Sequence, residues 1–147
     1  MKILLAVDGS ACSNAAVESV AARPWPPGSS LKIVSAVELP FMPTPETWAL
    51  PDSYYSQLEE AAQQQAQKAV DDAVARLANS QLEILTEVQS GRARDVILSE
   101  AEKWKADLVV VGSHGYSGWQ RFWLGSVSHS IASHAHCSVE VVRCMPK

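Results

Sequence analysis

The stretch ADLVVVGSHGYSGWQRFWLGS, residues 106–126, starts with an apolar run and ends where a helical pattern begins. The apolar residues of this run are continuous rather than alternating, as expected for a central parallel strand that is covered on both faces. Glycines at positions 112, 115 and 125 follow in the connection to the helix. A strand, a glycine-rich loop and a helix in this order predict one unit of an α/β fold.

The rest of the chain repeats this alternation. Short apolar runs predict strands over residues 2–8, 31–39, 82–88, 107–112 and 138–143. Helical patterns predict helices from Ser10, as N-cap, to about Ala22, over 52–79, over 92–104 and from near Ser126. The second of these helices carries one apolar stripe from Leu58 to Leu77. The alternation predicts an α/β fold with an open five-stranded parallel sheet, right-handed crossovers and helices on both faces.

Composition narrows the class of protein. The 147 residues fit a single domain, and the net charge of −4 argues against a broad nucleic-acid surface. No run approaches the roughly 18 apolar residues of a membrane span, and the first residues lack the pattern of a signal peptide. Cys12, Cys137 and Cys144 are odd in number and lack CxxC spacing, so we expect reduced, buried cysteines in a cytoplasmic protein.

The glycine-rich loop has the chemistry of a phosphate site. It follows the carboxyl end of a strand, and the free N–H groups of a helix starting at Ser126 favour an anion. It is not a Walker A loop, because it lacks lysine and the required spacing, and it is not the dinucleotide pattern GxGxxG. From these residues alone, both a phosphate loop and an ordinary surface turn remain open.

Three blocks of sequence carry a resemblance to a known family. The glycines and Ser126 match the pattern G-2x-G-9x-G-[S/T], and VDGS at 7–10, DLVVVGSHG at 107–115 and LGSVSHSIASHAHCSVEVVR at 124–143 agree with it. The chain resembles the ATP-binding branch of the universal stress protein family over essentially its whole length. The resemblance implies one domain over 1–147, strand order 3-2-1-4-5 in a Rossmann-like, adenine nucleotide alpha hydrolase-like sheet, and a proline-rich loop or lid over 40–55.

The resemblance also implies a nucleotide site at the carboxyl ends of the first and fourth strands. The base would lie against Ala6, Val7 and Ala36, and Asp8 would lie by the ribose and its phosphates. The remaining residues of the site would line the pocket or hold the triphosphate: Val111, Gly112, His114, Gly115, Gly125, Ser126, Val127 and Ser128. The cofactor implied is ATP, with Mg²⁺ or Mn²⁺ held by its phosphates.

The family also forms homodimers, often by edge-to-edge pairing of the last strand. Glu140 departs from the family pattern there, and a charge in an edge strand can block such pairing. The function implied is an ATP-binding stress-response sensor or binding module that acts on unidentified protein partners. Two alternatives remain: a slow ATPase or nucleotidyl-transferring enzyme, and a nucleotide-free dimeric interaction protein.

Some residues are left without an assigned role. Catalysis lacks support, because the loop has no lysine and the chain shows no nucleophile–histidine–acid arrangement. His129, His134 and His136 with Cys137 are spaced so that they do not converge on a metal. Two roles stay open for the aromatic residues, either local packing or a part in base stacking, a lid or a dimer surface. These residues are Trp48, Tyr54, Tyr55, Trp119, Phe122 and Trp123.

Overall fold

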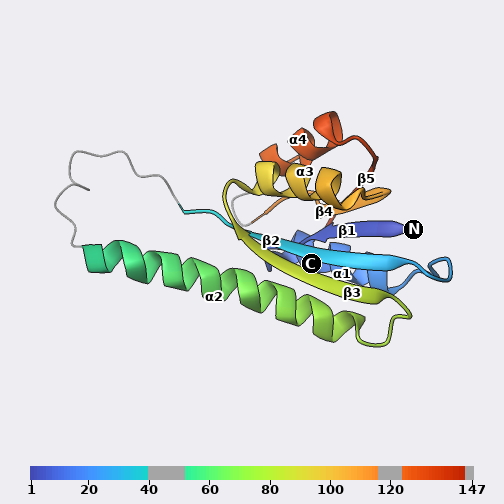
Figure 1. Cartoon of the computed structure of the whole chain (residues 1–147), viewed down its shortest axis with the longest axis horizontal. Helices are drawn as coiled ribbons and strands as arrows, with labels where there is room; N and C mark the ends of the chain where they lie inside the picture. Colours follow the sequence, from blue (N-terminus) through green and yellow to red (C-terminus); the bar gives the residue numbers. More distant parts are fainter. Residues whose placement is uncertain (40–51, 116–123, 145–147) are drawn as a thin grey trace.

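The computed structural model describes residues 1–39, 52–115 and 124–144. Five strands form one parallel sheet in the order β3-β2-β1-β4-β5. The strands are β1 (Lys2–Ala6), β2 (Ser30–Val37), β3 (Glu83–Ser90), β4 (Leu108–Gly112) and β5 (Ser138–Val142). The helices are α1 (Ala11–Ala21), α2 (Asp52–Leu77), α3 (Ala93–Trp104) and α4 (Ser126–His134) (Figure 1). The predicted fold class, element order and strand order are confirmed.

The core lies in two layers, one on each face of the sheet. Ile3 and Leu5 of β1 pack with residues of α1 and α2, whereas Leu4 packs with residues of α3 and α4. These three side chains are fully buried, as are Val109 and Val110 of β4. Burial on both faces is the physical reason why the central strands read as continuous apolar runs.

The parallel register brings the carboxyl ends of the central strands to one edge. Leu5 of β1 lies opposite Val110 of β4, and Gly112 at the end of β4 lies opposite Val142 of β5. The chain leaves β1 toward β2 and leaves β4 toward β5, so the strand order reverses between β1 and β4. Ligands of open α/β sheets bind at such a switch point.

Helix α2 is covered along only part of its length. The carboxyl-terminal part of its apolar stripe is buried, at Ala66, Ala69, Val70, Ala73 and Leu77. Tyr54, Tyr55 and Leu58 nearer its start are exposed, and the amino end of α2 projects past the sheet (Figure 1). No helix in the described parts of the chain is long and apolar enough to cross a membrane.

The cysteines differ from the prediction. Cys12 and Cys144 form a disulfide with a Cα–Cα distance of 4.6 Å, and Cys137 is free. The prediction of three reduced cysteines is therefore wrong for this pair. Helix α1 packs across β4 and reaches β5, and this places the first turn of α1 beside the residues that follow β5. A sequence separation of 132 residues hid that contact.

Candidate functional site

The turn after β1 is built by short polar side chains. Asp8 Oδ1 accepts a hydrogen bond from the Ser10 N–H at 2.9 Å, and the Asp8 N–H donates to Ser13 Oγ at 3.1 Å. Ser10 Oγ accepts from the Ser13 N–H at 3.3 Å, so Ser10 is the N-cap of α1 as predicted. These bonds fix the Asp8 carboxylate at the carboxyl edge of the sheet.

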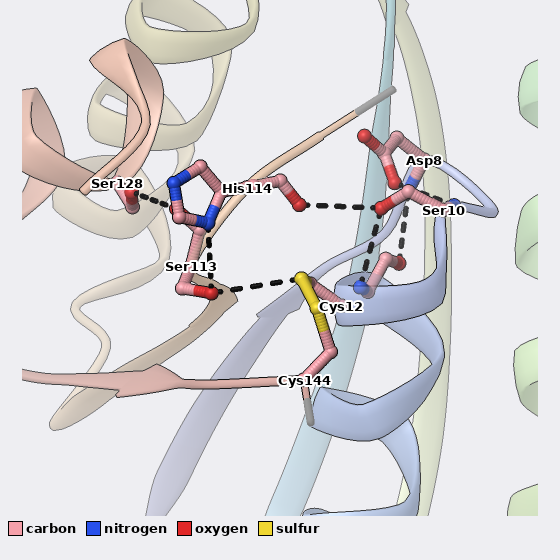
Figure 2. The surroundings of a disulfide bond; sticks show 8 residues. Asp8, Ser10, Cys12, Ser113, His114, Ser128 and Cys144 are labelled. Carbon is pink, nitrogen blue, oxygen red and sulfur yellow. Dashed lines mark hydrogen bonds between the residues drawn. A yellow bond between two sulfur atoms is a disulfide. The ribbon is translucent and has the colours of Figure 1, made fainter. Parts of the chain in front are cut away.

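The loop after β4 lies against this turn. A Cβ atom at Gly112 would lie 2.6 Å from the carbonyl carbon of Cys12, and one at Gly115 would lie 2.7 Å from Asp8 Oδ2. Ser10 Oγ donates to the His114 carbonyl oxygen at 3.4 Å (Figure 2). The structure thus brings Asp8, Gly112, His114 and Gly115 together across the switch point.

Ser113 connects the loop to three other elements. Its N–H donates to the Val142 carbonyl at the end of β5 at 2.8 Å. Its carbonyl accepts from the Gly125 N–H at 2.8 Å and from Ser128 Oγ at 2.9 Å, and its Oγ lies 3.5 Å from the Cys12 sulfur. Sequence reasoning missed this residue, although a serine between two glycines directly after a predicted strand was a usable signal.

Helix α4 starts without a side-chain cap. Gly125 is its N-cap in an extended conformation, and a Cβ there would lie 3.1 Å from the Ser113 carbonyl oxygen. The N–H groups of Ser126, Val127 and Ser128 have no acceptor among the described residues. The Ser128 hydroxyl is engaged in holding the loop, because it donates to the carbonyl groups of Ser113 and Gly125. The free N–H groups and the helix dipole can hold an anion.

A small apolar wall continues from this helix start. Ala6, Ala36 and Val127 are partly buried against the core under α3 and α4, and Val111 is buried within that core. Val7 lies on the opposite face, in the core under α1 and α2, and its N–H donates to the Val34 carbonyl at 2.9 Å. The side chains predicted to contact the base are therefore divided between the two faces.

A hollow of about 230 Å³ opens beside this wall. It lies between the end of β2 and the starts of α3 and α4, and it is lined by Glu38, Arg92, Ala93, Arg94, Ser126, Val127 and Ser130. Glu38 accepts from the Ala93 N–H at 3.1 Å and so caps α3. Sequence reasoning missed Glu38 and Arg92, because only the fold brings them next to Ser126.

Among the residues that the structure describes, the other candidates from the sequence do not extend the site. No group of three histidine, cysteine or acidic side chains that could hold a metal is found in residues 1–39, 52–115 and 124–144. Tyr54 and Tyr55 contact each other edge to face, with ring centroids 6.2 Å apart. Trp48, Trp119, Phe122 and Trp123 lie outside the described residues, so their roles stay predictions.

The chain is similar in sequence and in fold to known proteins. Universal stress protein YxiE of Bacillus subtilis is 26% identical over 145 residues, covering 97% of this chain and 98% of its own. The solved structure of UspA from Lactobacillus plantarum superposes with a TM-score of 0.82 at 26% identity and covers 97% of each chain.

Two further solved structures share the fold. A universal stress protein family protein from Arabidopsis thaliana with AMP bound has a TM-score of 0.70 at 18% identity, covering 99% of this chain and 92% of its own. A universal stress protein in complex with cAMP has a TM-score of 0.66 at 24% identity, covering 97% and 96%. The sequence profile of the Universal stress protein family matches residues 1–143. The chain therefore belongs to the universal stress protein family.

Proposed function

We propose that this chain binds ATP at the carboxyl edge of the sheet and acts as a nucleotide-dependent stress-response sensor. The open start of α4 carries the proposal, because the N–H groups of Ser126, Val127 and Ser128 have no acceptor among the described residues. Free N–H groups at a helix start bind phosphate well. The glycines at 112, 115 and 125 bring neighbouring groups so close that a side chain would crowd the loop.

The relatives support an adenine nucleotide as the ligand. One structural neighbour contains AMP and another contains cAMP, each a property of that protein. The glycine spacing of this chain resembles that of the ATP-binding branch, and this favours a triphosphate over a monophosphate. Ser126 and its neighbours would hold the phosphates, and Mg²⁺ or Mn²⁺ would be held by phosphate oxygens, since Mg²⁺ needs few protein ligands.

The remaining residues of the site would orient the nucleoside. The base would lie against Ala6 and Ala36, and Val7 would contribute only its backbone because its side chain is buried on the other face. Asp8 would accept a hydrogen bond from the ribose through the oxygen that faces Gly115. The hollow of about 230 Å³ is smaller than the roughly 300–1,000 Å³ of sites that enclose a drug-sized ligand, so the phosphates would lie outside it.

A direct test is to heat-denature the freshly purified protein and identify any released nucleotide by mass spectrometry. Titration calorimetry with ATP, AMP and cAMP then ranks the ligands, and ATP should bind most tightly and be recovered unhydrolysed. Absence of released nucleotide, together with no measurable binding of any of the three, contradicts the proposal. Steady release of ADP would instead favour the ATPase alternative.

Two substitutions at Ser126 separate its N–H group from its hydroxyl group. Ser126→Pro removes both, and the helix tolerates it because proline suits the first helical position and Gly125 is already extended at ψ 156°. Ser126→Ala removes only the hydroxyl group. We expect Ser126→Pro to weaken ATP binding about tenfold to a hundredfold beyond Ser126→Ala, since a hydrogen bond to a charged group contributes about 1.5–3 kcal/mol. Ser133→Ala, at an exposed site of the same helix, is the matched control.

We further propose a cytoplasmic homodimer that pairs through the outer edge of β5 and is read by partner proteins. Glu140 does not oppose this pairing as an unpaired charge would, because Arg23 and Ser19 on the α1 side hold its carboxylate. Sedimentation over a range of concentrations tests the dimer. A mass of 15.9 kDa at every concentration contradicts it.

A further inference from the structure

The disulfide between Cys12 and Cys144 lies next to the loop after β4, which is part of the candidate nucleotide site. Cys12 is in the first turn of α1, and Cys144 is two residues beyond the end of β5. Figure 2 shows the bond next to Ser113, with Asp8 and His114 in the same group of residues. The bond therefore joins two elements that both contact the loop after β4.

Two contacts connect the bond to that loop, both through Cys12. The Cys12 backbone leaves no room for a Cβ at Gly112, and the Cys12 sulfur lies 3.5 Å from Ser113 Oγ. Ser113 in turn holds the end of β5 through Val142 and the start of α4 through Gly125. Any shift of Cys12 is thus transmitted to the backbone that positions the free N–H groups of α4.

The two sulfur atoms differ in their surroundings. Cys12 is 5% exposed, whereas Cys144 is half-buried and is the accessible side of the bond. A helix start stabilises a thiolate, and the Ser113 hydroxyl can donate to it. Cys12 is therefore the better leaving group when an external thiolate attacks the Cys144 sulfur.

We propose that Cys12–Cys144 is a thiol–disulfide exchange site for a dithiol reductant and that its redox state sets the affinity of the nucleotide site. This inference rests on the proposed function. Disulfides in cytosolic proteins are usually transient or redox-sensing, so a bond at this position suits a sensor. The oxidised form binds the nucleotide more tightly, because the bond holds α1 and the end of β5 in the arrangement that the loop needs.

The exchange is balanced in electrons and protons. One thiolate of the reductant attacks the Cys144 sulfur, the bond to Cys12 breaks, and Cys12 leaves as a thiolate. The second thiolate of the reductant attacks its own sulfur in the mixed disulfide and releases Cys144. The reductant loses two electrons and becomes a disulfide, and the two protons of its thiol groups end on Cys12 and Cys144.

The test begins with thiol counts under denaturing conditions. The oxidised protein should show one reactive thiol, that of Cys137, and the protein treated with dithiothreitol should show all three. ATP affinity is then measured by calorimetry on both forms and on Cys144→Ser. We expect the reduced form and Cys144→Ser to bind ATP about fivefold to tenfold more weakly, a coupling at the low end of the usual range. Cys137→Ser is the control and should keep the full redox response.

Linkage provides a second readout. If oxidation tightens ATP binding by some factor, saturating ATP must make the disulfide harder to reduce by the same factor in equilibrium with dithiothreitol. Equal ATP affinities in the two redox forms overturn the inference and leave the proposed function standing. Three reactive thiols in the oxidised protein also overturn it. Failure of both forms to bind any adenine nucleotide overturns the proposed function, and the inference with it.

Discussion

Gly115 and Asp8 decide how closely the two sides of the switch point approach each other. A Cβ at position 115 would lie 2.7 Å from Asp8 Oδ2, and Asp8 Oδ1 is held by the Ser10 N–H. We expect Gly115→Ala to displace the carboxylate and lower the free energy of unfolding by about 1 kcal/mol, the value of one hydrogen bond. Urea unfolding of both single variants and of the double variant Asp8→Ala/Gly115→Ala measures the effect.

In the Asp8→Ala background, Gly115→Ala should leave the free energy of unfolding almost unchanged, because the carboxylate oxygen atoms that oppose the new Cβ are gone. The resulting coupling energy between the two positions is then about 1 kcal/mol, as expected of residues in contact. If Gly115→Ala costs the same in both backgrounds, the two residues do not meet. Gly112 would not give so clean a result, because its neighbour is the Cys12 backbone, which cannot rotate away.

Local patterns predicted the elements but not all of the contacts between them. Two predictions were correct because each depends on neighbouring residues in the sequence: the buried strand that contains Val109 and Val110, and Ser10 as the N-cap of α1. The bond between Cys12 and Cys144 depends on how α1 crosses the sheet, and the sequence carries no local trace of that path. The hollow at Arg92 was missed for the same reason, since three elements must first be placed side by side.

Helix α2 shows that a local pattern does not predict how much of an element is covered by the rest of the protein. Leu58 and Leu77 belong to one apolar stripe, but Leu58 is 38% exposed and Leu77 is fully buried. Periodicity tells which face of a helix is apolar, but it does not tell where the covering sheet ends. We expect Leu77→Ala to lower the free energy of unfolding by about 2–5 kcal/mol. The matched variant Leu58→Ala should change it by less than about 0.5 kcal/mol.

Urea unfolding of the two leucine variants checks this difference. The two substitutions remove the same atoms from the same helix, so only their burial separates them. A large loss of stability in Leu58→Ala would mean that the amino-terminal turns of α2 are covered in solution. A second copy of the chain would then be the first candidate to test by sedimentation.

The ion pair between Arg23 and Glu140 fastens the end of α1 to β5. The hydrogen bond from Arg23 lowers the pKa of Glu140. A carboxylate with a lowered pKa stabilises the folded state above its unfolded pKa of about 4.3, and that contribution is lost as the pH falls through the folded value. Glu140→Gln should therefore lower the free energy of unfolding by about 0.5–1 kcal/mol at pH 7. This loss of stability should shrink steadily as the pH falls below about 4.

Glu18→Gln is the control for this prediction. Glu18 pairs with Arg76 at 3.1 Å, but its side chain is 72% exposed, against 27% for Glu140. An exposed pair is screened by water and contributes little, so its loss should leave unfolding almost unchanged at every pH. Equal costs for the two variants at pH 7, or a cost for Glu140→Gln that does not depend on pH, would contradict the assignment.

At the scale of the whole molecule, one covalent bond ties the beginning of the chain to its end. Cys12 and Cys144 are separated by 132 residues, so the disulfide encloses most of the chain. Closing so large a loop restricts the unfolded state more than the folded one. We expect reduction to lower the free energy of unfolding by about 2–4 kcal/mol. Urea unfolding with and without dithiothreitol, in the absence of nucleotide, measures this change.

Two comparisons separate an effect of the disulfide on the unfolded state from a loss of contacts in the folded state. Cys144→Ser should match the reduced protein and no longer respond to dithiothreitol, whereas Cys137→Ser should respond fully. The dependence of unfolding free energy on urea should be steeper without the bond, because the released chain exposes more surface when it unfolds. An unchanged slope together with a lower midpoint would assign the effect to the folded state. An unchanged urea midpoint would mean that the bond does not stabilise the protein. Non-covalent contacts alone would then hold β5 against α1.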